Sequence, residues 1–305
     1  MASLPTLRQL NYFVLLSETL HFSKAAERAF VTQSSFSMGI LELEKQLGGV
    51  LFERDNRNVR LSALGETLLP KAKQLLTDAT DFVNINNNLQ HPFATPINLV
   101  IIPSILPFVL GPLTQHIKQH HPTITLNIKE LQSEAALTAL TETKVDMVLM
   151  AEPYNLTGFL STALIDEPLY WVGHADLARK MKLSQTTSFF DLDLEQLILL
   201  EEGHCLSDHT LSACPRETVK SFKNSPKAFE VNSLMALYTL LQNQYGYSLL
   251  PQMAIKSAGF ADDLTSLLIT DAPARTISLV TRPTLAKPFE YDALKNIFQT
   301  VFQQH

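Results

Sequence analysis

Between Ile97 and Gln303 the sequence alternates short apolar runs with helical patterns, and this alternation constrains the fold more than any other feature. Apolar runs of about four to eight residues between turn residues are typical of buried strands. Strands that alternate with helices predict mostly parallel sheets with helices on both faces. We expect strands at 97–102, 124–131, 145–151, 169–172, 196–200, 247–250, 264–268 and 277–280, and helices at 106–119, 134–141, 234–245 and 290–303.

The size and composition of the chain agree with this architecture. Of 305 residues, 46% are hydrophobic and 18% are charged, which excludes a disordered chain and predicts a soluble protein with an ample core. The C-terminal segment is long enough for two α/β lobes with a ligand crevice at the carboxyl ends of their strands. Prolines interrupt the uncharged stretch 97–113, so we expect no membrane span. Without a secretory signal, we expect a cytoplasmic protein whose two cysteines stay reduced or act transiently.

The first 61 residues predict three short helices followed by a basic hairpin. Ser23 and Thr32 are suited to cap the second and third helices, and Gly48-Gly49 is suited to end the third. Val50-Leu51-Phe52 and Val59-Arg60-Leu61 flank a polar tip and predict the hairpin. Two short helices followed by such a hairpin are typical of a winged helix-turn-helix.

In this motif the recognition helix enters the major groove and presents its N-terminal side chains to base edges. The formal net charge of the whole chain is −6, so DNA contact would depend on a local basic patch. We expect phosphate contacts from Arg54 and Arg57 in the hairpin. The residues expected at the groove are Thr32, Gln33, Ser34, Ser35, Ser37 and Met38. An ordinary three-helix bundle with a solvated charged loop is the alternative.

Residues 62–90 predict a long helix with an apolar seam. The seam residues recur at spacings of three and four, at Leu61, Leu64, Leu68, Ala72, Leu75, Ala79 and Phe82. A seam of this length buries little surface in one chain, so we expect it to pair with a second chain, and packing within the same chain is the alternative. Pro70 is expected to kink or break the helix, and residues 84–88 are expected to form a hinge.

The order of these motifs resembles the LysR-type transcriptional regulators. The matching segments are Leu7-Arg8-Gln9-Leu10, Phe22-Ser23-Lys24-Ala25-Ala26, Val31-Thr32-Gln33-Ser34, Leu51-Phe52-Glu53-Arg54, Leu64-Gly65 and Tyr247-Ser248-Leu249-Leu250-Pro251. The resemblance covers the whole chain. It implies an N-terminal all-α winged helix-turn-helix with a linker helix, and a C-terminal α/β effector domain of two doubly wound, periplasmic-binding-protein-like lobes. Met38 stands where many members carry arginine.

The resemblance also implies boundaries and partners. We expect a DNA-binding domain at 1–62, a linker and dimerisation helix at 63–91, and a regulatory domain at 92–305. Lobe I would comprise about 92–166 and 269–305, and lobe II about 167–268. The implied partners are promoter DNA, RNA polymerase and further copies of the chain in a dimer of dimers. No enzymatic activity, cofactor or metal is implied.

One segment, Glu202-Gly203-His204-Cys205-Leu206 with Asp208 and Cys214, resembles the redox loop of the OxyR peroxide sensors within that family. The resemblance implies that hydrogen peroxide oxidises Cys205 to a sulfenic acid, which Cys214 resolves to a disulfide. It further implies a set of residues that bind peroxide or tune the thiolate: Ser104, Ser133, Gly203, His204, Asp208 and Arg282.

The spacing of the two cysteines bears on how such a switch would work. A continuous helix across 206–213 would hold Cys205 and Cys214 roughly 13 Å apart along its axis. A disulfide tolerates a Cα separation of up to about 7 Å, so the segment would have to refold to close the bond.

Other interpretations of this chain remain open. The cysteines could be inert buried thiols, zinc ligands together with His204, Asp208 and His209, or part of a nucleophilic enzyme. A LysR-type regulator that binds a small metabolite between its lobes is the main alternative to a peroxide sensor. A periplasmic-type solute-binding protein or a cleft enzyme would share the two-lobed fold, but neither would explain the N-terminal helices.

Overall fold

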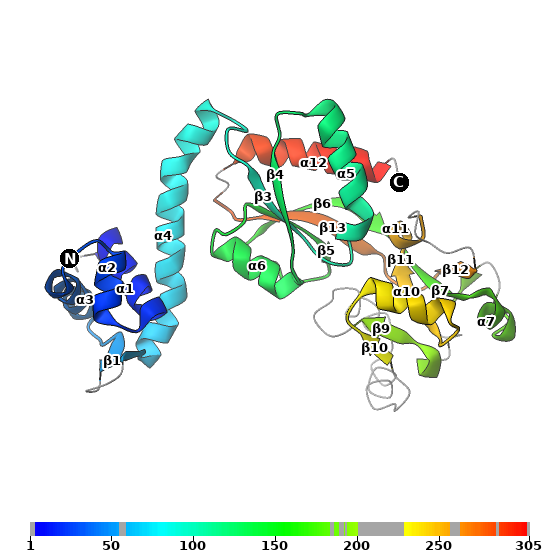
Figure 1. Cartoon of the computed structure of the whole chain (residues 1–305), viewed down its shortest axis with the longest axis horizontal. Helices are drawn as coiled ribbons and strands as arrows, with labels where there is room; N and C mark the ends of the chain where they lie inside the picture. Colours follow the sequence, from blue (N-terminus) through cyan, green and yellow to red (C-terminus); the bar gives the residue numbers. More distant parts are fainter. Residues whose placement is uncertain are drawn as a thin grey trace. The chain divides into compact units, whose positions relative to one another are not determined.

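The computed structural model describes residues 4–54, 59–183, 186–188, 192, 194–200, 229–256, 263–284 and 287–303 (Figure 1). The chain forms two compact units. The first comprises residues 1–90 and 141–143, and the second comprises residues 91–140 and 144–305. Within the described ranges, no helix is both long enough and apolar enough to cross a membrane.

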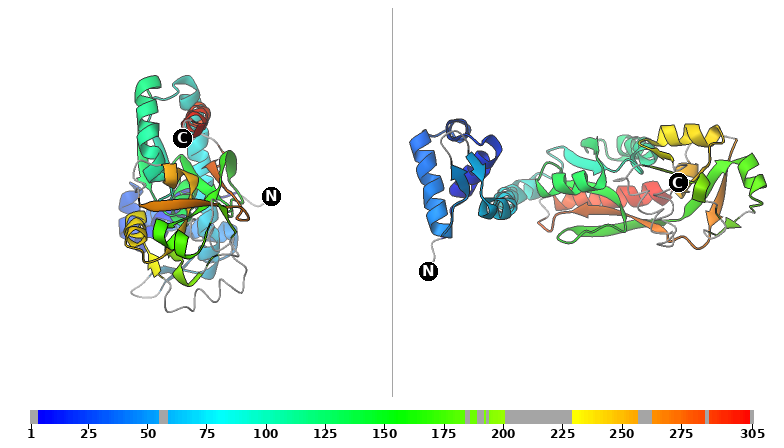
Figure 2. Two further views of the ribbon diagram at one scale, coloured as in Figure 1. Left: turned by 90° about the vertical axis from the view of Figure 1, so that its right-hand side faces the viewer. Right: turned by 90° about the horizontal axis from the view of Figure 1, so that it is seen from below.

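The first unit is a three-helix cluster with a two-stranded wing and a long final helix. Its elements are α1 (Leu7–Thr19), α2 (Phe22–Arg28), α3 (Gln33–Leu47), β1 (Phe52–Arg54), β2 (Val59–Leu61) and α4 (Ala63–Gln90). The core is apolar and fully buried around Phe13, Leu16, Phe36, Ile40 and Leu43. The helices α1, α2 and α3 contact one another, and α1 also packs against α4 (Figures 1 and 2).

Local signals set most helix ends in this unit. The Thr32 hydroxyl accepts a hydrogen bond from the Ser35 amide at 3.3 Å, and Gly48 ends α3 in the left-handed conformation at φ +69°, so both predictions are confirmed. The prediction for Ser23 is wrong, because α2 begins at Phe22 and its cap is His21, whose Nδ1 accepts from the Lys24 amide. Phe22 packs against the core, which draws the helix start forward in the chain.

The wing is fastened to α3 through one buried carboxylate. Glu44 Oε1 accepts hydrogen bonds from the amides of Leu51 at 2.8 Å and Phe52 at 3.2 Å. These amides begin the wing, which pairs as an antiparallel ladder with Phe52 opposite Leu61. The side chain of Glu44 therefore fixes where the wing leaves the recognition helix.

The long helix α4 is continuous, which contradicts two sequence-based expectations. Pro70 lies within it and does not break it, and the helix runs on through residues 84–88 to Gln90, so there is no hinge there. Proline in a helix interior costs about 3 kcal/mol. Leu68, Leu69 and Ala72 flank Pro70 and pack on the core of this unit, and this packing offsets the cost. Asparagine is a weak helix former but does not end a helix by itself.

The second unit contains a five-stranded sheet in its first lobe. Its strands, in spatial order, are β4 (Leu126–Glu130), β3 (Ile97–Ile101), β5 (Met147–Glu152), β13 (Arg275–Thr281) and β6 (Leu160–Glu167). β3 pairs in parallel with β4 and β5, whereas β13 runs antiparallel to both β5 and β6. Four of these five strands therefore run in the same direction, as the sequence predicts, and β13 returns from the second lobe and enters between β5 and β6 in the opposite direction.

Three helices cover this sheet. They are α5 (Leu106–His120), α6 (Ser133–Thr141) and α12 (Pro288–Gln303). α5 and α12 lie side by side over one face, and α6 covers the other (Figures 1 and 2). Their apolar stripes, which include Leu113, Leu140 and Phe298, join the buried strands in one core.

The second lobe is built from shorter elements. Its strands are β7 (Leu169–His174), β8 (Thr186–Thr187), β9 (Ile198–Leu200), β10 (Phe229–Val231), β11 (Tyr247–Pro251) and β12 (Leu264–Ile269). Its helices are α7 (Ala175–Lys180), a 3₁₀ turn (Leu194–Gln196), α10 (Leu234–Gln242) and α11 (Gln252–Lys256). The order β11-β7-β12-β8 forms one sheet, and β9 pairs in parallel with β10. Ser233 caps α10 by accepting a hydrogen bond from the Ala236 amide.

The chain passes between the lobes along two strand connections. β6 ends at Glu167, and β7 begins two residues later in the second lobe. The return path leaves β12 at Ile269 and enters β13 at Arg275. Glu167 and Arg275 thus mark the first-lobe ends of both crossings.

Candidate functional site

The recognition helix α3 presents a polar face beside its buried stripe. Phe36, Ile40 and Leu43 point into the core, at spacings of four and three residues. The residues predicted to meet DNA are on the outside: Thr32, Gln33, Ser34 and Ser35 are exposed, Ser37 is half-buried, and Met38 is 57% exposed. The structure therefore places these predicted residues on one accessible segment at the start of α3.

The position of α3 depends on a close approach to α1. The rings of Tyr12 and Phe36 stack with their centroids 4.6 Å apart. A Cβ atom at Gly39 would come within 2.7 Å of the Tyr12 ring, so a larger residue there would push the two helices apart. This contact explains why glycine follows Met38.

Two basic residues of the wing, Arg54 and Arg60, lie in the described part of the chain. Arg54 is the last residue of β1, opposite Val59, while Arg57 lies outside the described residues. Arg60 Nε contacts Glu53 Oε2 at 2.8 Å in an exposed pair across the wing. The phosphate contacts predicted for Arg54 and Arg57 stay predictions.

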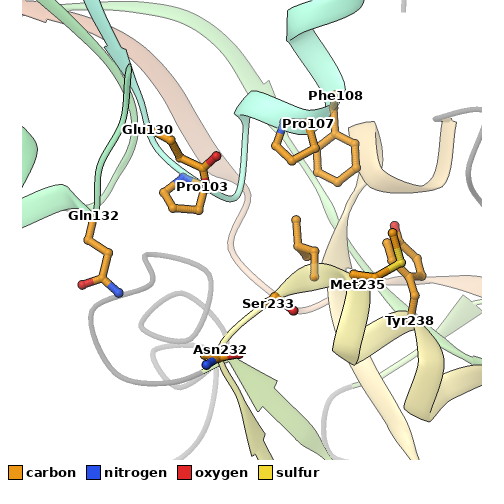
Figure 3. A pocket seen from close by; sticks show the side chains of 10 residues that line it. Pro103, Pro107, Phe108, Glu130, Gln132, Asn232, Ser233, Met235 and Tyr238 are labelled. Carbon is orange, nitrogen blue, oxygen red and sulfur yellow. The ribbon is translucent and has the colours of Figure 1, made fainter. Parts of the chain in front are cut away.

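A cavity of about 470 Å³ lies between the two lobes of the second unit. Figure 3 shows residues of the first lobe on one side and residues that precede or belong to α10 on the other. The first lobe contributes Pro103, Pro107, Phe108, Glu130 and Gln132, and the second contributes Asn232, Ser233, Leu234, Met235 and Tyr238. The lining is largely apolar with a few polar groups, which is typical of a small-molecule pocket.

Ser104 and Ser133 each follow a residue that lines this cavity, and each is buried, with 2% of its surface exposed. Ser104 follows the cavity residue Pro103, and Ser133 follows the cavity residue Gln132 and starts α6. Both come after parallel strands, β3 and β4, so the carboxyl edge of the sheet brings them to the same side. Two of the residues predicted to bind peroxide thus follow neighbouring strands at the same edge of the sheet.

A buried guanidinium that sequence analysis missed holds Ser104. Arg275 Nη1 donates to Ser104 Oγ at 3.2 Å, and Nη2 donates to the Ser104 carbonyl at 3.3 Å. Arg275 Nε pairs with Glu167 Oε2 at 2.9 Å, and both side chains are essentially inaccessible to solvent. The other oxygen of Glu167 accepts from the Met253 amide at the start of α11. In the sequence, Arg275 is recognisable only as an arginine beside an apolar run. Its partner Glu167 lies 108 residues away, so no local pattern links the two residues.

Arg282 lies apart from the Arg275 cluster, and its predicted role beside Cys205 stays a prediction. Its Nη1 donates to the carbonyls of Leu140 at 2.8 Å and Val145 at 3.1 Å, between α6 and β5. Arg282 follows the C-terminal end of β13, whereas Arg275 begins that strand. Seven residues of extended chain separate the two by roughly 23 Å. The guanidinium beside Ser104 is therefore that of Arg275.

Gly203, His204, Cys205, Asp208 and Cys214 all lie outside the described residues. The flanking strands are described: β9 ends at Leu200, and β10 leads through Val231 into the cavity wall. In the described part of the chain, no group of three or more histidine, cysteine, aspartate or glutamate side chains could hold a metal ion.

Comparison with known proteins assigns the chain to a family. Residues 7–66 match the family of bacterial regulatory helix-turn-helix proteins of the lysR family, and residues 90–303 match the LysR substrate binding domain. The chain belongs to the LysR family of DNA-binding transcription regulators, which is not an enzyme family. Its two-lobed regulatory fold and its helix-turn-helix agree with the expected fold class.

Individual relatives point to two kinds of regulator. The chain is 42% identical to the HTH-type transcriptional regulator EstR of Acinetobacter baylyi, over 99% of this chain and 98% of that protein. It is 28% identical to the transcriptional dual regulator OxyR of Escherichia coli, over 98% and 96% of the two chains. A solved point variant of full-length OxyR from Pseudomonas aeruginosa superposes with a TM-score of 0.71 at 27% identity, covering 97% of this chain and 98% of that one.

The buried ion pair predicts a large and non-additive effect on stability. Glu167→Ala should lower the free energy of unfolding of the regulatory unit by about 3–5 kcal/mol, because it leaves the Arg275 guanidinium buried without its carboxylate. Arg275→Met combined with Glu167→Leu should cost much less than the sum of the single changes. Calorimetric unfolding of the full-length protein measures both.

The exposed pair between Lys295 and Asp292 supplies the control, since Asp292→Ala should leave the transition unchanged. If Glu167→Ala leaves the unfolding transition as unchanged as this control does, the ion pair of Arg275 and Glu167 does not stabilise the regulatory unit.

Proposed function

We propose that this LysR regulator senses hydrogen peroxide through Cys205 and signals by forming a Cys205–Cys214 disulfide. The observation that carries the proposal is the combination of the Gly203-His204-Cys205 segment with a second cysteine nine residues on, in a chain similar to OxyR proteins along its whole length. The proposed setting is the reducing cytoplasm, where such a disulfide is transient and carries information. The regulated partners would be promoter DNA and RNA polymerase.

The proposed chemistry balances with peroxide as the only oxidant. The Cys205 thiolate attacks one peroxide oxygen, the O–O bond breaks, and hydroxide leaves and takes up a proton to become water. The Cys214 thiol then attacks the sulfenic sulfur, releasing a second water as the disulfide forms. Two thiols thus lose two electrons, and one peroxide gains them.

The cluster of Ser104, Arg275 and Glu167 supports the proposal, because it is polar and offers hydrogen bonds to a small ligand. Because Ser104 Oγ accepts a hydrogen bond from Arg275, its own O–H group can donate to a peroxide oxygen. A buried hydroxyl held by a guanidinium suits a ligand of two oxygen atoms better than a large metabolite. In this proposal Ser104 and Ser133 orient peroxide, and Arg275 supplies the cation beside Ser104.

Mapping the oxidised cysteines tests the proposal. Full-length protein treated with a small excess of hydrogen peroxide should yield a Cys205–Cys214 peptide by mass spectrometry after digestion. A dithiol reductant should reverse it. Cys205→Ser should abolish the change in DNA occupancy, whereas Cys214→Ser should still reach the sulfenic acid without an internal disulfide.

If the wild-type protein forms no such linkage, and Cys205→Ser still changes DNA occupancy with peroxide, the redox proposal fails. A second candidate would then take its place: a regulator that binds a small metabolite. The cavity of about 470 Å³ favours this alternative, since it has the volume of a typical ligand pocket.

For DNA binding, we infer that α3 enters the major groove with Gln33, Ser34, Ser37 and Met38 toward the bases. The exposed thioether of Met38 offers an apolar contact for a thymine methyl group. Arg54 and Arg57 of the wing would contact phosphates.

We further infer that α4 pairs two chains. Leu75 is 52% exposed and Phe82 is 80% exposed, one heptad apart on the same face of the helix. Leu68 and Ala72 of the predicted seam instead pack against the core of their own unit. The unpaired part of the seam is therefore its C-terminal half, and two-fold pairing there matches a two-fold DNA site.

The pairing predicts a change of oligomeric state. Leu75→Glu combined with Phe82→Glu should shift full-length protein toward smaller assemblies at micromolar concentration, because facing apolar surfaces would become facing charges. Thr80→Glu, on the opposite side of α4, should leave the mass unchanged. Sedimentation velocity measures it, and an unchanged mass for the double variant would contradict the pairing.

A further inference from the structure

One hydrogen bond joins the two helices of the DNA-binding motif at their exposed ends. Ser23 Oγ donates to Gln33 Oε1 at 2.8 Å. Ser23 is the second residue of α2, and Gln33 is the first residue of α3. Because His21 caps α2, the Ser23 hydroxyl is available for this contact.

The bond fixes which way the Gln33 amide points. A glutamine amide carries an acceptor oxygen on one corner and an NH₂ group with two donors on the other. With its oxygen held toward α2, the exposed side chain of Gln33 turns its NH₂ group outward. The group turned outward toward a DNA base is thus the NH₂ group, while the amide oxygen faces α2.

The two purines respond differently to such a group. Adenine presents N7 as an acceptor beside the N6 donor, so a paired contact needs the amide oxygen and nitrogen together. Guanine presents two acceptors, N7 and O6, and an NH₂ group complements both. A free glutamine favours adenine for this reason, and a glutamine held by its oxygen loses that advantage.

We propose that Ser23 is a positioning residue that sets the base preference of Gln33, favouring guanine over adenine at the base it faces. The inference rests on the proposed entry of α3 into the major groove. Ser23 itself touches no base in this scheme, and it acts through the orientation of the amide. A bond that merely braced α2 against α3 would change affinity for all sequences alike.

The test is a selection from a randomised double-stranded DNA library with full-length protein, followed by sequencing of the bound fraction. Gln33→Ala identifies the position that Gln33 faces, because the preference there should flatten. Wild-type protein should select guanine at that position. Ser23→Ala should lower the guanine-to-adenine ratio there by at least about fivefold, the lower end of what a paired base contact discriminates.

Ser23→Thr keeps the hydroxyl and should restore the wild-type ratio. Ser17→Ala, which removes a hydroxyl from α1 that donates to the Val14 carbonyl, controls for small losses of stability. If Ser23→Ala lowers affinity but leaves the ratio unchanged, or if wild-type protein selects adenine, the inference on Ser23 is overturned. If Gln33→Ala changes the preference at no position, the placement of α3 in the groove fails instead.

Discussion

The buried pair of Arg275 and Glu167 is the interaction on which the regulatory unit depends. Burying two charges is costly, and it is tolerated only where hydrogen bonds satisfy both groups. Here the guanidinium bonds Glu167 and both the hydroxyl and the carbonyl of Ser104, and the carboxylate also accepts the Met253 amide. The two residues end β6 and begin β13, so this one cluster fixes both chain crossings between the lobes and the wall of the cavity.

This placement relates the proposed chemistry to the fold. Ser104 is held from the side of the first lobe, while Met253 belongs to α11 of the second lobe. The proposed disulfide lies in the segment between β9 and β10 of the second lobe. Both connections of this lobe to the first lobe pass beside Arg275. Because the Arg275 cluster fixes the two connections between the lobes, formation of the disulfide would change the conformation of the second lobe.

Sequence analysis predicts correctly the helix ends that depend on residues close together in the chain. Thr32 caps α3 and Gly48 ends it as expected, since a cap needs only a side chain and an amide three residues away. Pro70 and Ser23 were misjudged, because tertiary packing of Leu68 and Phe22 outweighs local preference. Sequence analysis does not find the contact of Arg275 with Glu167, because the two residues lie far apart in the chain, and it does not find the half-exposed edge strand β6.

The rate at which Cys205 reacts with hydrogen peroxide tests the central claim most directly, namely that Ser104, held by Arg275, orients peroxide for that thiol. Stopped-flow measurement should give a second-order rate constant for Ser104→Ala that is lower than wild type by about 10²-fold or more, the scale of one positioned proton donor. The reaction of Cys205 with iodoacetamide, which needs no such donor, should be unchanged. Equal peroxide rates for the two proteins would contradict the account.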